Sequence, residues 1–488
     1  MDLSPRPTPT SVVTHRTLVG RLDRLDVWSL SYLFIVIIGF GFLFTFYDIF
    51  DINVTWLQTC LQLKSGCTPA NAGNPLETVV LLNLVGYAVG TVVLSPIGDR
   101  VGRKKMLMVT LTLTGVGSLV NALAPDYVNF VIARTITGIG IGADLALVNA
   151  YISEMAPKNG RAKYASTIFC FSAVGAFLGG LIGLILSTPS APWPHGLSIA
   201  IAGPELQGSG WRWAYAIGAG LAIVGLVLRF QLPESPRWLL SRGRADEAEV
   251  IVAQMEERAR RKGPLREPVE DHEAMPEPAR AAIRDLLSNP TYVRRIILLL
   301  AMWIFAYATV YGFSAGFTSV LAALTKAGKP VYSPAEAGLI ACIGVAGIFL
   351  AALFCVKFVE KMDRRFWLPF GVIVTFIGCF ITALGGSNLY VAFAGSAIIF
   401  FGFDVWVGPT YAISAELFPT RARGTGFALV DGVGHVGGAL AIIVVVPIIH
   451  HLSPLGAFLL LAAFQAVAAV LLQLAPRTRD VPLDVLSP

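Results

Sequence analysis

The chain has 488 residues, of which 55% are hydrophobic and only 14% are charged, whereas soluble proteins carry about 25% charged residues. This composition excludes a soluble domain and predicts a polytopic membrane protein. The net charge of +6 does not indicate a nucleic-acid partner, because the basic residues lie in short loops between apolar runs, where they set membrane topology. The partner that the composition implies is the lipid bilayer.

Twelve apolar runs follow one another along the chain, each close to the roughly 20 residues that cross a bilayer as a helix. The polar tail at 1–30 is not a signal peptide, because the apolar run after it is too long. An even number of spans places both termini and the basic loops on the cytoplasmic side of a cell membrane, plasma or inner. The expected spans are 31–54, 77–97, 106–123, 127–152, 165–186 and 213–230 in the first half, and 295–324, 335–358, 367–384, 389–412, 424–449 and 455–474 in the second.

These spans divide the chain into five parts. We expect a cytoplasmic N-terminal tail at 1–30, an N-terminal six-helix bundle at 31–232, a cytoplasmic hinge with short helices at 233–293, a C-terminal six-helix bundle at 294–474 and a cytoplasmic tail at 475–488. The predicted fold class is therefore an all-α polytopic membrane protein with 12 transmembrane helices in two bundles.

The segment 55–76 is expected to be an outside loop, with Lys64 as its single base. It contains Cys60 and Cys67, which pair as a disulfide if the outer compartment is oxidising. The sequence leaves this pairing open.

Four charged residues lie within the apolar spans of the first half. Asp48 and Asp51 share one side of the first helix, and Arg134 and Asp144 lie ten residues apart on the fourth. A charge that faces lipid costs at least about 2.5–3.5 kcal/mol, so these side chains are expected to face the bundle interior or a watery cavity. The alternative is that one or both acids are hydrated at the outer mouth, and this applies more to Asp51, which is nearer the loop, than to Asp48. Together the four residues predict a proton relay.

Two motifs occur twice along the chain at nearly the same offset. The segment 98–105, with one acid and four bases, has a degenerate copy at 360–365, and the motif that starts at Glu154, with Pro three and Arg seven positions later, recurs at Glu416. Each Glu lies 55 or 56 residues after the first acid of its segment. Two motifs that repeat in step indicate a duplicated membrane half, so the two bundles are expected to be pseudo-symmetric.

The second half supplies the candidates for substrate binding. Trp303, Tyr307 and Tyr311 form an aromatic stripe at helical spacing, a pattern that core packing also produces. Asp431 and His435 are four apart on one helix face, and a packing histidine explains His435 as well as a titrating one does. The candidate substrate-binding residues are Trp303, Tyr307, Tyr311, Asp404, Thr410, Asp431 and His435.

These motifs, together with residues 233–239, resemble the major facilitator superfamily, and within it the sugar-porter-like metabolite:proton symporters. The resemblance covers nearly the whole chain, but Ser95 stands where the first glycine of the repeated motif is usual. It implies that Asp48 and Arg134 couple transport to protons, and that charges of the motifs latch the two halves on the cytoplasmic side. The gating residues that it implies are Asp99, Arg100, Arg103, Glu154, Arg161, Glu234, Arg237, Glu360, Glu416 and Arg423.

The predicted function is secondary active transport, namely proton-coupled symport of a small organic metabolite by alternating access, with an organic or aromatic acid as the favoured substrate. The alternatives are an inorganic phosphate or sugar:proton symporter, a proton-independent facilitator or exporter, and a non-transporting membrane sensor. The sequence has no metal-ligand cluster, nucleophile motif or nucleotide loop, so no enzyme activity, cofactor or metal site is predicted. The expected partners are the small-molecule substrate and protons, and the expected state is a monomer.

Overall fold

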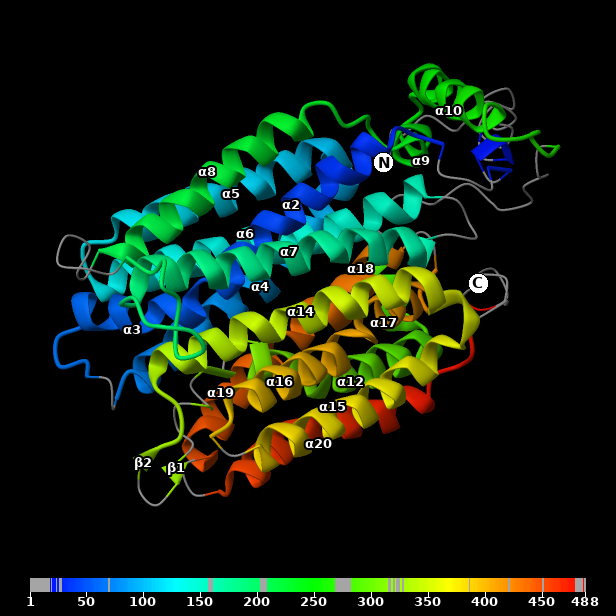
Figure 1. The fold of residues 1–488 in the computed structure, drawn as a ribbon. Coiled ribbons are helices and arrows are strands. Elements are labelled where there is room, and N and C mark those ends of the chain that lie inside the picture. The colour runs from blue at the N-terminus through cyan, green and yellow to red at the C-terminus, as the bar shows by residue number, and fades with distance from the viewer. Residues whose placement is uncertain are drawn as a thin grey trace.

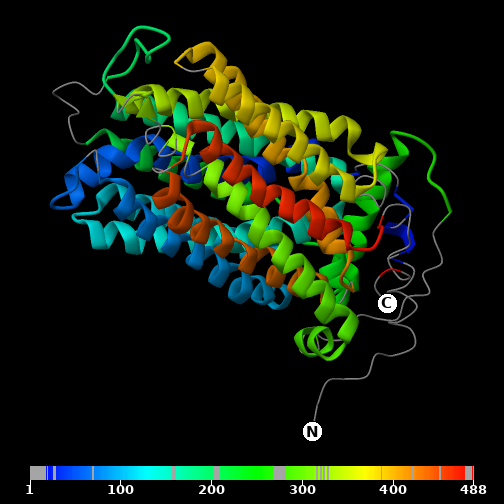
Figure 2. The ribbon, with the colours of Figure 1, turned by 90° about the horizontal axis from the view of Figure 1, so that it is seen from below.

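The structure is a computed structural model that describes residues 18, 20–22, 24–25, 29–68, 71–156, 161–201, 209–267, 282–314, 317–318, 321, 325–326, 329–385, 387–419, 422–449, 452–478 and 486. These residues are mostly helical and form two bundles that lie side by side (Figures 1 and 2). The helices within each bundle run roughly alongside one another, as a polytopic membrane fold requires.

The first bundle crosses the membrane six times by the length and composition of its helices. Its first crossing is interrupted at Asp51, which ends one helix and begins the next. The elements are α2 (Tyr32–Phe50), α3 (Ile52–Leu63), α4 (Gly73–Val101), α5 (Arg103–Leu123), α6 (Tyr127–Met155), α7 (Arg161–Ser187) and α8 (Gly210–Arg229).

In its described residues, the second bundle has five helices long and apolar enough to cross the membrane, and one of them is built from α16 and α17. α18, the π-helical turn η5 and α19 follow one another where the sixth crossing is expected. The elements are α12 (Pro290–Ser314), α14 (Pro334–Phe358), η2 (Val359–Lys361), η3 (Arg364–Phe366), α15 (Trp367–Leu384), α16 (Leu389–Asp404), α17 (Val407–Glu416), α18 (Arg423–Phe427), η5 (Ala428–Gly432), α19 (Val436–Ile449) and α20 (Pro454–Gln473). A two-residue strand pair, β1 (Thr325–Lys326) and β2 (Lys329–Pro330), follows α12.

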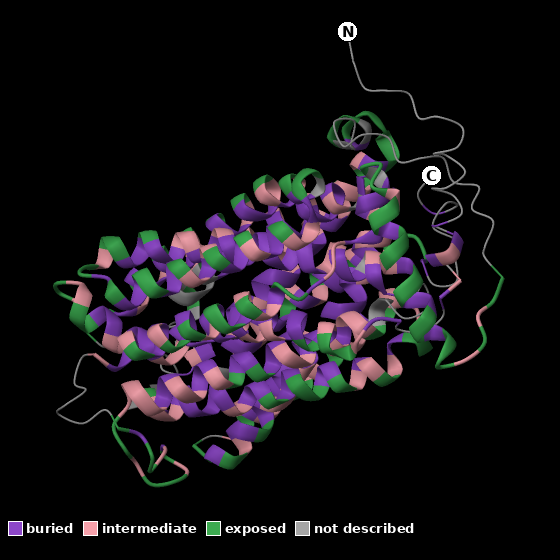
Figure 3. Ribbon diagram, turned by 90° about the horizontal axis from the view of Figure 1, so that it is seen from above, coloured by how far each residue is buried: buried purple, intermediate pink, exposed green. Residues whose placement is uncertain are grey.

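Eleven helices of the described residues are long and apolar enough to cross a bilayer, and α18, η5 and α19 lie in the remaining expected span, 424–449. Large apolar side chains are exposed on the outward faces, for example Leu123 at 69% and Ile223 at 64%. Buried positions concentrate along the middle of the molecule, while exposed ones occupy its outer faces and its ends (Figure 3). An apolar outer surface of this kind suits a lipid environment.

Between the bundles, the chain forms three short helices, α9 (Pro236–Ser241), α10 (Ala245–Arg260) and α11 (Ala282–Ser288). α9 and α10 lie beyond one end of the bundles, which we call the hinge end (Figure 1). α3 and the connection to α4 lie at the opposite end, which we call the loop end. By the predicted topology, the hinge end is cytoplasmic and the loop end is outside.

Two connections differ from the expectation. The segment 98–105 is not a loop: α4 continues to Val101 and α5 begins at Arg103, so Gly102 is the single residue between them. Its φ of +119°, which side chains with a Cβ rarely adopt, lets the chain reverse in one step.

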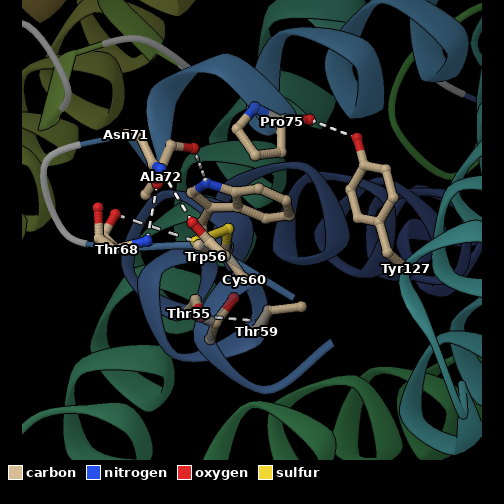
Figure 4. Close-up of a disulfide and its surroundings, with 11 residues drawn as sticks. Thr55, Trp56, Thr59, Cys60, Thr68, Asn71, Ala72, Pro75 and Tyr127 are labelled. Carbon is tan, nitrogen blue, oxygen red and sulfur yellow. Dashed lines mark hydrogen bonds between the residues drawn. A yellow bond between two sulfur atoms is a disulfide. The ribbon is translucent and has the colours of Figure 1, made fainter. Parts of the chain in front are cut away.

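The segment 55–76 is also more ordered than an open loop, because α3 continues to Leu63 and α4 begins at Gly73. Cys60 and Cys67 form a disulfide beside this turn (Figure 4). The indole Nε1 of Trp56 donates to the carbonyl of Ala72 at 2.7 Å. These contacts fix the end of α3 against the start of α4.

The two halves contact each other at both ends. Along their length α7 packs on α14, and α4 packs on α19. At the loop end the hydroxyl of Thr318 donates to the carbonyl of Asn53 at 3.1 Å, and at the hinge end α18 packs on α4 and α6. The two halves therefore touch each other at both ends of the molecule.

Candidate functional site

Glu234 and Arg103 organise the hinge end of the first half. One carboxylate oxygen of Glu234 accepts from the backbone N–H groups of Arg103 at 2.9 Å, Lys104 at 3.1 Å and Ser235 at 3.0 Å. A carboxylate at the N-terminus of α5 satisfies helix N–H groups that have no partner within the helix. The guanidinium of Arg103 pairs with Glu154 at 2.8 Å, so three of the predicted gating residues meet here.

The second half repeats this ion pair. Arg364 pairs with Glu416, and the partners are 52 residues apart, against 51 for Arg103 and Glu154. The duplication inferred from the motifs thus extends to side-chain contacts. Arg364 was not among the predicted gating residues, although it lies four positions after Glu360, as Arg103 does after Asp99.

The other predicted gating residues take less central positions. Arg100 and Glu360 are exposed, and Arg237 is half-buried in α9. For Asp99, Arg161 and Arg423 the helical backbone is described, but their side chains lie outside the description.

Asp48 and Arg134, to which the family resemblance assigns a joint role, form an ion pair. Arg134 Nη1 lies 2.8 Å from Asp48 Oδ2 and 2.9 Å from the backbone carbonyl of Asp48, and the two side chains are 3% and 0% exposed. The guanidinium also lies over the ring of Tyr215, 5.6 Å from its centroid. Removing one partner of such a buried pair leaves an uncompensated charge and costs about 3–5 kcal/mol. The pair is thus stable only while both charges are present.

Asp51 is fully buried near this pair, on the same helix side as Asp48. Neither of its carboxylate oxygens has a hydrogen-bond partner among the described residues. Its full burial does not fit a carboxylate that is hydrated at an outer mouth.

Asp144 does not join this group. It forms a bidentate pair with Arg229, at 2.5 and 2.8 Å, and accepts from Thr110 at 2.7 Å. Both charged side chains are 1% exposed. The sequence did not reveal Arg229, because an arginine at the end of a span usually marks only topology.

A small pocket lies at the interface of the two halves, next to the Asp48–Arg134 pair. Its lining includes Arg134 and Asn83 from the first half and Tyr311 from the second. The remaining lining residues are Ile49, Ile52, Val79 and Val80. One guanidinium thus borders a small, mostly apolar space that residues of both halves line.

The predicted aromatic stripe of α12 belongs to a buried cluster. The hydroxyl of Tyr307 donates to Asp431 at 2.5 Å and lies 2.8 Å from the hydroxyl of Tyr411. Trp303 stacks on Tyr307, with 4.9 Å between ring centroids, and its Nε1 donates to Ser414 at 3.0 Å. Four of the seven predicted substrate residues, Trp303, Tyr307, Asp431 and His435, lie within this cluster, and Tyr311 lies at its edge.

Tyr87 joins the same cluster from the first half. Its hydroxyl lies 3.4 Å from Asp431, and its ring stacks on His435 with 3.7 Å between centroids. Tyr87 and Tyr411 were not predicted, because a single tyrosine in an apolar run carries no sequence signal.

Asp404 and Thr410 lie apart from these contacts. Asp404 ends α16, and no hydrogen bond to its carboxylate is present among the described residues. Thr410 is fully buried in α17, and its hydroxyl has no partner within the described part of the chain.

Comparisons with known proteins agree with this architecture. A family profile described as "Sugar (and other) transporter" matches residues 33–484. The niacin transporter NiaP of Acinetobacter baylyi is 26% identical, over 96% of this chain and 99% of its own. The arabinose-proton symporter of Bacillus subtilis is 27% identical, over 73% of this chain and 74% of its own.

Among solved structures, the proton:xylose symporter XylE matches with a TM-score of 0.68 at 20% identity, over 93% of this chain and 98% of that chain. At this identity the match shows the fold, which is that of a membrane transporter and not of an enzyme. The chain belongs to the sugar (and other) transporter family of the major facilitator superfamily.

Proposed function

We propose that this transporter couples the uptake of a small organic metabolite to protons by alternating access. The observation that carries the proposal is the buried Asp48–Arg134 pair beside a pocket that both halves line. Such a pair changes its charge when a proton binds, and the pocket changes its access when the halves move. Protonation and the change of access therefore both act at the Asp48–Arg134 pair and its adjacent pocket.

The coupling follows from charge balance. A proton that binds the Asp48 carboxylate removes the negative partner of Arg134, and the buried guanidinium then needs another anion. Arg134 already lines the pocket, so a substrate carboxylate is able to take the place of Asp48. This favours an organic or aromatic acid as the substrate, carried inward together with the proton.

The names of two relatives support a metabolite cargo and a proton drive: one is a niacin transporter and the other an arabinose-proton symporter. A sugar or inorganic phosphate as cargo, and transport without protons, are the competing functions. We further propose that the ion pairs at the hinge end act as gates, that this end faces the cytoplasm of a cell, and that the monomer is the working unit. The side chains of these pairs are 11% to 20% exposed, so water still reaches them, which suits contacts that break in each cycle.

The test is uptake into proteoliposomes with radiolabelled nicotinate and D-xylose as probes, with and without an imposed inward proton gradient. We expect nicotinate to accumulate only with the gradient. Asp48→Asn is expected to keep gradient-independent exchange and to lose accumulation. Asp126→Asn is the control, because Asp126 is an exposed N-cap of α6, where Asn caps equally well. Accumulation by Asp48→Asn at the wild-type level, or accumulation that ignores the gradient, contradicts the proposal.

A further inference from the structure

Near the Arg134 pocket, one tyrosine ring of α4 and one of α12 face each other across a narrow slot. Asn83 lines the pocket and Tyr87 lies four residues later on α4, while Tyr311 lines the pocket and Tyr307 lies four residues earlier on α12. Four residues of helix advance about 6 Å. α4 and α12 each contribute one residue to the pocket and one to the slot. The pocket and the slot are therefore neighbours about one helical turn apart. Both lie at the interface between the halves.

The side chain of His435 fills this slot. Its ring centroid lies 3.7 Å from that of Tyr87 and 3.6 Å from that of Tyr307. These separations leave room for one flat ring and for no thicker group. The walls come from different halves, so the slot exists only when the halves are closed against each other.

The floor of the slot is polar. Asp431 accepts from Tyr307 at 2.5 Å and from Tyr87 at 3.4 Å, and its backbone carbonyl contacts His435 Nδ1 at 2.8 Å. Asp431 has no Lys or Arg partner among the described residues. The edge of a ring in the slot thus meets tyrosine hydroxyl groups and the Asp431 carboxylate. An anionic group on the same ligand would find its cation at Arg134, which lines the neighbouring pocket.

The backbone around His435 is irregular. Asp431 lies in the π-helical turn η5, and His435 lies at the break between this turn and α19. A π-helical turn is frequently found at functional sites. On either side of His435, a Cβ added at Gly434 would lie 2.6 Å from Trp303 and one at Gly438 would lie 2.5 Å from Tyr311. The backbone is therefore held against α12, so a displacement of His435 would be a rotation of its side chain and not a shift of the helix.

We infer that the slot between Tyr87 and Tyr307 is a binding subsite for the flat aromatic ring of the substrate, and that His435 occupies it as a displaceable stand-in when no substrate is bound. The substrate class is one aromatic ring with one carboxylate, the ring in the slot and the carboxylate at Arg134. The carboxylate contact rests on the proposed function, whereas the ring contact does not.

The test measures binding to the purified protein without any proton gradient, using three probes of similar size. Benzoate carries a flat ring and a carboxylate, cyclohexanecarboxylate carries a puckered ring and the same charge, and benzamide carries the flat ring without charge. We expect benzoate to bind about tenfold more tightly than cyclohexanecarboxylate, since an aromatic stack is lost in the latter. His435→Ala removes the competing ring and should tighten benzoate binding.

Substitutions at Tyr87 separate a ring contact from general damage. Tyr87→Phe should keep the preference for benzoate, and Tyr87→Leu should abolish it. Tyr390→Leu, at a tyrosine that is 60% exposed, is the control and should leave the preference unchanged. Equal binding of benzoate and cyclohexanecarboxylate, or weaker benzoate binding by His435→Ala, overturns the inference. Binding of benzamide with no binding of benzoate supports the slot and refutes the carboxylate contact at Arg134.

Discussion

Gly102 is the position where a single methyl group should do the most damage to the hinge end. Its φ of +119° and ψ of +147° lie near a region used almost only by glycine, at a cost of about 1–3 kcal/mol for other residues. An added Cβ would also lie 2.5 Å from Glu234 Oε2. Moving this carboxylate loses at least one of its hydrogen bonds to backbone N–H groups, each worth about 1.5–3 kcal/mol. Gly102→Ala should therefore cost about 3–5 kcal/mol.

The assay is the free energy of unfolding in detergent micelles, with Gly243→Ala as the matched control. Gly243 also has a positive φ, of +70°, but an added Cβ there meets nothing within 4 Å. Gly243→Ala should lower the free energy of unfolding by only about 1–2 kcal/mol, which is the cost of the backbone conformation alone. In a Glu234→Ala background the cost of Gly102→Ala should fall by the part due to the carboxylate. Equal costs at the two glycines, or no change in that background, would refute the reasoning.

Three further predictions concern other parts of the chain. Cys60→Ser should cost about 2–2.5 kcal/mol of stability, the loop-closure entropy of a disulfide with sequence separation 7, and adding reductant to the wild type should reproduce this loss. Arg364→Glu should lower uptake of a transported probe, and adding Glu416→Arg should restore part of it, whereas two independent losses would speak against a functional ion pair. Burial alone would raise the pKa of Glu256, but hydrogen bonds from Arg21 and Arg24 more than reverse this and lower it below the ordinary 4.5. Glu256 therefore stabilises the protein fully above about pH 4.5 and loses this contribution as the pH falls through the lowered pKa, so a melting curve against pH should be flatter for Glu256→Gln than for the wild type.

The sequence predicted the spans, the duplication and the Asp48–Arg134 pair for one physical reason. Hydrocarbon penalises every polar group, so the apolar runs, the short basic connections and the few intramembrane charges all stand out. Two acids in helix one and one arginine at a compatible depth in helix four had few alternatives as partners. The segment 98–105 was predicted as a loop because it is rich in charged residues. In the structure, however, both flanking helices extend into it.

The remaining site residues gave no such signal. Tyr87 and Tyr411 are single tyrosines in apolar runs, and tyrosine in a membrane helix is ordinary. Arg21 and Arg24 lie in the N-terminal tail, for which the sequence predicted only a cytoplasmic location, yet both pair with Glu256 of α10, at 2.9 and 2.5 Å. Such contacts depend on how distant segments pack, which periodicity and motifs do not encode.

The two duplicated halves stabilise their buried charges with different partners. In the first half, Arg134 and Arg229 are each bound to an aspartate, whereas in the second half Asp431 is held by tyrosine hydroxyls. Tyr87 of the first half reaches Asp431 at 3.4 Å, a longer and weaker contact than the 2.5 Å bond from Tyr307 within the second half. When the halves rock apart, the contact across the interface must break while the one within the second half is kept. We therefore expect that a ring bound between Tyr87 and Tyr307 stabilises the closed state, because it adds contacts that exist only while the two halves meet.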